Sequence, residues 1–92
     1  MIPLARREMI RAAQWYDRQG TGLGDRFLDE VTAGFRAIAE FPAAHPMILK
    51  ERRRWLLQFF PYGVIYRIED ETIVIVVVAN LKRRPRYWAR RK

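Results

Sequence analysis

Arginine side chains near the end of this sequence are the groups best suited to chemistry with a partner. The segment NLKRRPRYWARRK (residues 80–92) carries seven Lys or Arg residues and no acidic residue, with a Tyr-Trp pair at its centre. A second run, Arg52–Arg54, opens a stretch rich in aromatic residues. A guanidinium group stays charged at any workable pH, and its planar fork makes two-point contacts with phosphate. These residues therefore predict a surface for a polyanion or an acidic protein.

The net charge of +8 lies entirely in the second half of the chain. Residues 1–49 carry equal numbers of basic and acidic residues, and no acidic residue follows Glu71. Such a one-sided distribution favours a charged partner over the plainer interpretation, a basic tail that only improves solubility. The residues expected to contact that partner are Arg52, Arg53, Arg54, Lys82, Arg83, Arg84, Arg86, Tyr87, Trp88, Arg90 and Arg91.

Aromatic residues accompany these cations. Tyr62, Tyr66, Tyr87 and Trp88 can supply stacking surface or phenol groups to a bound polyanion. A metal-free ribonuclease can stabilise its phosphorane with Arg or Lys and move protons with Tyr or Arg, so catalysis is chemically feasible. The plainer interpretation makes these aromatic side chains packing groups. It is favoured for Tyr66, and for Trp88 both interpretations stay open.

The sequence offers little for metal or cofactor chemistry. It has no cysteine, and its one histidine, His45, sits in a loop without a second soft ligand. The segment GTGLGD (residues 20–25) has alternating glycines, but it joins two helices instead of following a strand, which excludes a dinucleotide-binding loop. The carboxylates are not grouped as a two-metal nuclease requires. No metal and no cofactor is therefore expected.

Two helices are predicted in the first half of a single domain that spans residues 1–92. Apolar residues recur at three- and four-residue spacing in residues 4–19 and again in residues 23–41. Pro3 suits the start of the first helix, and Pro42 ends the second. Because the connection between them is short, the helices are expected to form an antiparallel hairpin.

Three strands are predicted in the second half. Residues 54–60, 64–69 and 73–79 are rich in β-branched or aromatic residues and are separated by turn segments. The last of them lacks polar alternation, which is typical of a strand covered on both faces. Residues 41–49, with two prolines, are expected to be a loop. The predicted fold is α+β, a two-helix hairpin packed on a three-stranded antiparallel sheet, with a basic C-terminal tail after residue 80.

The strand order predicts where the basic clusters lie. In a meander the first and third strands run the same way, so the start of the first and the exit of the third lie at opposite ends of the sheet. Arg52–Arg54 is therefore expected near the acidic turn at residues 69–71, and the tail near the turn that contains Tyr62. The two clusters merge only if the tail folds back along the sheet.

Nothing in the sequence predicts a membrane protein. The longest apolar run, residues 73–79, is far too short to span a bilayer, and the charged N-terminal segment does not resemble a signal peptide. With no cysteine to form disulfides, the chain is expected to be soluble and cytoplasmic.

Several motifs, in order along the chain, resemble the RelE/ParE superfamily of type II toxins. They are AAQWYDRQGTGLGDRFLDEV, FPAAHP, RRRWLLQFFPYGVIYRI and RRPRYWARR, and together they cover essentially the whole chain. The resemblance implies a strand before the first helix. Only Met1 and Ile2 are available for it, so either that edge strand is very short or the start codon is misassigned.

The superfamily divides into two functions. RelE-like members cut mRNA on the ribosome, whereas ParE-like members poison DNA gyrase without cutting RNA. The nuclease pattern maps onto Arg54, Arg83 and Tyr87, but Leu56 and Gly63 stand where two of its cations are expected. Losing two cations from a phosphate-stabilising site would weaken transition-state stabilisation. The resemblance therefore favours a gyrase-directed toxin; the alternatives are a metal-free mRNA endoribonuclease and a non-toxic basic nucleic-acid-binding module.

Both toxin interpretations imply the same partner, a cognate acidic or amphipathic antitoxin with a flexible segment that folds onto the toxin. The basic second half suits such a partner because complementary charge speeds encounter. The tail is expected to be the main contact surface for the target, with Arg52–Arg54 as a second one. The antitoxin is expected to compete for the tail.

Overall fold

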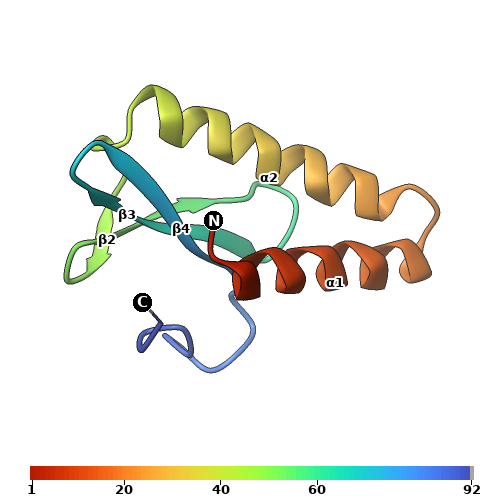
Figure 1. The fold of residues 1–92 in the computed structure, drawn as a ribbon. Helices are drawn as coiled ribbons and strands as arrows, with labels where there is room; N and C mark the ends of the chain where they lie inside the picture. Colours follow the sequence, from red (N-terminus) through yellow and green to blue (C-terminus); the bar gives the residue numbers. More distant parts are fainter. Residues whose placement is uncertain (92) are drawn as a thin grey trace.

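The computed structural model describes residues 1–91, and in it two helices lie across one face of an antiparallel sheet (Figure 1). This arrangement confirms the predicted α+β class. The elements in chain order are α1 (Pro3–Gln19), α2 (Leu23–Glu40), β1 (Met47–Leu49), β2 (Arg52–Leu56), β3 (Tyr62–Glu69) and β4 (Thr72–Asn80).

The helix hairpin is tight because its connection is rich in glycine. Gly22, the residue just before α2, has φ of 83°, in the left-handed region that glycine adopts without strain. Two residues later the helices meet. A Cβ atom on Gly24 would lie 2.4 Å from the backbone oxygen of Ala13, so only glycine fits there. The Gly24 N–H also donates to the Asp17 carboxylate at 2.8 Å, which fixes the start of α2 against α1.

The sheet has the order β1-β2-β3-β4, with every neighbouring pair antiparallel. Strands β2, β3 and β4 form the predicted meander, although β2 begins at Arg52 and ends at Leu56, earlier than its apolar pattern indicated. The connection from β2 to β3 is held by α2, because the Glu30 carboxylate accepts the backbone N–H groups of Gln58 and Phe59. These contacts fix the end of the sheet that leads into the tail.

A short extra edge strand is present, but not at the N-terminus. It is β1, which lies within the predicted loop at residues 41–49 and pairs with β2. Met1 and Ile2 form no strand in the described part of the chain, although the Ile2 N–H donates to the Ile75 carbonyl of β4 at 3.2 Å. Lys50, with φ of 43°, turns the chain sharply between β1 and β2, which lets a three-residue strand pair there.

Both faces of the sheet are buried, as the apolar run in β4 predicted. The helices cover one face, and the tail turns back under the other, on the side away from α2 (Figure 1). The buried residues of the helix-side core are Ala13, Phe27, Val31, Ile38, Leu57, Val64, Tyr66, Ile75 and Val78. Those of the tail-side core are Ile65, Val76, Val77, Ala79 and Trp88.

Neither helix of residues 1–91 combines the length and the hydropathy that crossing a bilayer requires.

Candidate functional site

The tail folds back along the sheet, which is the condition under which the two basic clusters meet. Trp88 anchors it, with 5% of its surface exposed. The Arg52 guanidinium donates to the Arg91 carbonyl at 2.6 Å, and Arg86 reaches the Ile48 carbonyl of β1 at 3.4 Å. The structure therefore joins the start of β2 to the end of the tail. In this arrangement Trp88 packs inside the molecule, and its ring is not presented to a partner.

Tyr87 is held between two arginines. Its hydroxyl accepts the backbone N–H of Asn80 at 3.1 Å. The Arg83 guanidinium carbon lies 3.8 Å from the centroid of its ring, and that of Arg91 lies at 5.6 Å. Cation–π attraction of this kind orders the side chains that make it. The tail thus presents its cations from a defined position.

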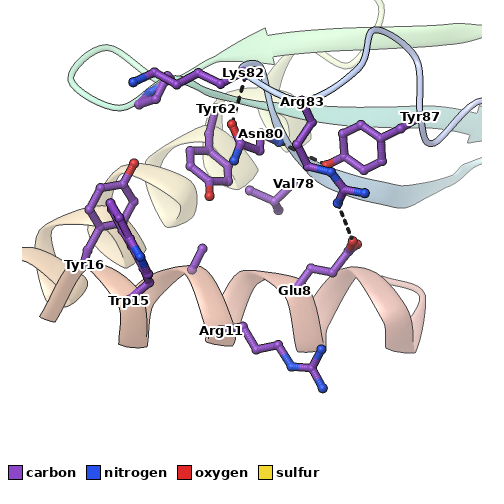
Figure 2. Close-up of a pocket in the computed structure, with 12 residues that line it drawn as sticks. Glu8, Arg11, Trp15, Tyr16, Tyr62, Val78, Asn80, Lys82, Arg83 and Tyr87 are labelled. Carbon is purple, nitrogen blue, oxygen red and sulfur yellow. Dashed lines mark hydrogen bonds and ion pairs between the residues drawn. The ribbon is translucent and has the colours of Figure 1, made fainter. Parts of the chain in front are cut away.

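Glu8 of α1 is the partner that sequence reasoning missed. Its carboxylate makes a two-point ion pair with Arg91, including a 2.8 Å bond from Nη2 to Oε2. It also lies 3.7 Å from Arg83, as the dashed line in Figure 2 shows. The hydrogen bond to Glu8 raises the pKa of Arg91, against the opposing effect of burial. No local pattern pairs Glu8 with a residue 83 positions away.

A pocket of ≈ 460 Å³ lies between the tail and the sheet, and we call it the basic pocket. Its polar wall has four arginines and no acidic residue. The full lining is Ile48, Arg54, Ile65, Ala79, Asn80, Leu81, Arg83, Arg84, Pro85, Arg86, Tyr87 and Trp88. The pocket therefore brings together all three residues of the nuclease pattern, which sequence alone placed on separate elements.

Gly63 of β3 lies against Arg54, one of the residues of this pocket, and has little room for a side chain of its own. A Cβ atom there would meet the side chains of Arg54 and Leu56, each at 3.3 Å. The space beside Gly63 is thus already filled by one cationic and one apolar side chain. Leu56 and Gly63 supply no charge at the two positions where the nuclease pattern expects cations.

A second pocket, of ≈ 530 Å³, opens between α1 and the far end of β4, and we call it the aromatic pocket (Figure 2). Trp15, Tyr16 and Tyr62 contribute rings to it, and burial raises the pKa values of both tyrosines. Lys82 and Arg83 border it from the tail, whereas the Arg11 side chain extends away from the others (Figure 2).

Several predicted site residues have structural contacts. Arg53 donates to the carbonyls of Ala43 and His45, which anchors the loop before β1. Tyr66 has none of its surface exposed and donates its hydroxyl to the Pro42 carbonyl, which confirms its packing role.

Other predicted residues face solvent. Lys82, Arg84 and Arg90 are exposed along the tail. In residues 1–91, no group of three or more His, Cys, Asp or Glu side chains is placed to hold a metal ion.

Comparison with known protein families identifies the family of this chain. A family model described as the ParE toxin of the type II toxin–antitoxin system parDE matches residues 2–87. The chain belongs to the ParE toxin family. The resemblance seen in the sequence motifs is thereby confirmed, on the ParE-like side of the superfamily. No curated protein and no solved structure matches the chain.

Membership of the ParE family makes the chain the toxin of a type II module and implies an antitoxin partner. The match spans both helices, the whole sheet and the tail as far as Tyr87. Trp88 and Arg91, which anchor the tail in this ParE toxin, lie after the last residue of the family match.

Proposed function

We propose that this toxin inhibits growth by binding DNA gyrase through the exposed cations of its tail, and that a cognate antitoxin neutralises it by covering the same surface. The family match carries the proposal. The site supports it, because Lys82, Arg84 and Arg90 are exposed on a tail that Trp88 and Glu8 hold in place. A surface ordered before binding loses less conformational entropy in forming a complex.

Charge supports the antitoxin part of the proposal. The chain carries a net charge of +8, and no acidic residue lines the basic pocket. An acidic antitoxin segment would be drawn toward such a surface, since complementary charge raises the rate of association. Gyrase and the antitoxin would then compete for the tail in the cytoplasm.

A second candidate function is metal-free cleavage of mRNA on the ribosome. One observation favours it, namely that Arg54, Arg83 and Tyr87 line a single pocket. Two features weigh against it. The Arg83 guanidinium stacks on the Tyr87 ring and borders Glu8, so part of its charge is compensated. The two cations missing at Leu56 and Gly63 also reduce the stabilisation available to a phosphorane.

The test is supercoiling of relaxed plasmid by purified gyrase, with and without the toxin released from its antitoxin. We expect inhibition that added antitoxin reverses. A tail variant with Lys82→Gln, Arg84→Gln and Arg90→Gln should need at least about tenfold more protein for half-inhibition, which corresponds to about 1.4 kcal/mol of binding energy. A control with Arg18→Gln, Arg26→Gln and Arg36→Gln removes the same charge from exposed helix positions and should inhibit like the parent chain.

Unimpaired supercoiling in the presence of a folded toxin would refute the gyrase proposal. Cleavage of mRNA on ribosomes, lost in both Arg54→Gln and Tyr87→Phe, would replace it with the second candidate. If the two triple variants inhibit gyrase equally poorly, total charge rather than the tail governs the effect.

A further inference from the structure

The basic pocket has a property that a protein-binding tail does not explain. Four arginines line one cavity, and like charges at short range repel. Arg83 is partly compensated by Glu8, and Arg86 donates to the Ile48 carbonyl. Within residues 1–91, the guanidinium groups of Arg54 and Arg84 have no hydrogen-bond or ion-pair partner. The pocket therefore has more cationic N–H donors than acceptor groups to bind them.

The remaining walls of the pocket are apolar. Ile65 and Ala79 of the sheet and Trp88 of the tail are almost fully buried and line its inner side. A cavity of ≈ 460 Å³ has the size of a small-molecule site, in which an apolar surface contacts the ligand body and a few polar groups fix its orientation. Arginine is the side chain that best matches phosphate oxygens with paired donors. The combination fits a small molecule that has phosphate groups at one end.

We propose that the basic pocket binds the phosphate groups of a free nucleotide. Its pyrophosphate unit would accept hydrogen bonds from Arg54 and Arg84, while the nucleoside lies against the apolar wall. Since Arg84 and Trp88 belong to the tail and Arg54 belongs to β2, the ligand connects the tail to the sheet. Occupancy of the pocket therefore also stabilises the folded-back position of the tail.

Isothermal titration calorimetry of the whole chain tests this proposal, with pyrophosphate, ADP and a single-stranded hexanucleotide as separate probes at constant ionic strength near 0.15 M. At this ionic strength the Debye length is about 8 Å, so distant charges contribute little. We expect one pyrophosphate per chain. Arg54→Gln and Arg84→Gln should each weaken binding about tenfold or more, as expected for the loss of a charged donor. Arg36→Gln, an exposed control on α2, should change binding less than about twofold.

The probes distinguish the source of the phosphate. ADP binding more tightly than pyrophosphate supports a nucleotide ligand. Pyrophosphate binding without any gain for ADP overturns the nucleoside part and leaves an inorganic phosphate site. The proposal is overturned if the hexanucleotide binds while pyrophosphate and ADP do not, and if all three variants lose the same amount of affinity for it. That result would indicate diffuse attraction to a polyanion.

Two further outcomes are decisive. No heat of binding for pyrophosphate or ADP up to about 1 mM, the weak end of specific affinity, overturns the proposal. If Arg54→Gln unfolds the chain, Arg84→Gln decides alone, because the Arg84 side chain is exposed and makes no hydrogen bond or ion pair within residues 1–91. The assay contains neither gyrase nor ribosomes, so its result is independent of the proposed target.

Discussion

At the scale of single residues, Glu8 determines how the tail is held. Its side chain and that of Arg91 are 21% and 16% exposed, so their two-point ion pair is much less screened by solvent than a surface pair. Arg83 lies within reach of the same carboxylate. One acidic side chain of α1 thus compensates two arginines of the tail.

Replacing this carboxylate should loosen the tail. Glu8→Gln keeps the size of the side chain but leaves the Arg91 guanidinium without its counter-charge, which we expect to cost about 1–3 kcal/mol of stability. The arginine-rich tail should then be cleaved faster by trypsin, whereas cleavage elsewhere should change less. The measurement is the rate of tail cleavage at neutral pH, followed by mass spectrometry. Glu40→Gln, at an exposed position of α2, is the matched control. Equal cleavage rates in both variants would show that Trp88 and the other contacts of the tail hold it without Glu8.

At the scale of elements, α2 packs on β2 through a glycine and a tryptophan. A Cβ atom on Gly34 would lie 2.5 Å from the Cε3 atom of the Trp55 ring. The helix can therefore approach the sheet closely only because this position has no side chain. The indole ring occupies the space that any larger residue would require.

Gly34→Ala tests this contact. Alanine favours a helix over glycine by about 1 kcal/mol, so an unhindered site would be stabilised. Here we expect a net loss of about 1–3 kcal/mol from overpacking against Trp55. Thermal unfolding followed by circular dichroism measures it, with the exposed Thr32→Ala as a control on the same helix. Adding Trp55→Leu should recover part of the loss, since the two changes are coupled. A rise in melting temperature for Gly34→Ala would contradict the packing argument.

Apolar periodicity was sufficient to predict the helices and the meander. The helix bounds differ from the predicted ones by one residue each, at Pro3 and Glu40. Strand β1 was missed because three residues show no periodicity, and its pairing depends on the edge of β2. The basic residues of the site were visible in the sequence, but their convergence was not. It depends on tertiary contacts such as those of Trp88 and Glu8, which no local pattern encodes.

At the scale of the whole molecule, the sheet is a middle layer between the helix hairpin and the tail. Tyr16, Tyr62 and Tyr66 lie on its helix side and contribute to one core. Burial raises the pKa of each of these phenols above 10.0. The unfolded chain therefore releases these protons at lower pH than the folded chain does.

This difference makes stability depend on alkaline pH. The protonated phenols contribute fully to the free energy of unfolding below about pH 10. This contribution is lost as the pH rises through their raised pKa values, because the phenols of the unfolded chain ionise first and this ionisation stabilises the unfolded state. We expect the free energy of unfolding in urea to fall between about pH 10 and pH 12. Tyr66→Phe should be less stable at neutral pH but should show a shallower fall above pH 10. If the free energy of unfolding of this variant falls as steeply with pH as that of the parent chain, Tyr66 does not cause the pH dependence.

The layered arrangement also sets an order of events during synthesis. The residues of β4 emerge from the ribosome before those of the tail, and a chain grows by about 5–20 residues per second. Since β4 and the tail are the last segments to be made, the helices are complete before the sheet, and the tail can cover the sheet only after Trp88 has been added. Until the tail has folded back, the face formed by Ile65, Val77 and Ala79 has no cover from its own chain. A newly made toxin therefore exposes this apolar face to nearby proteins until its own tail covers it.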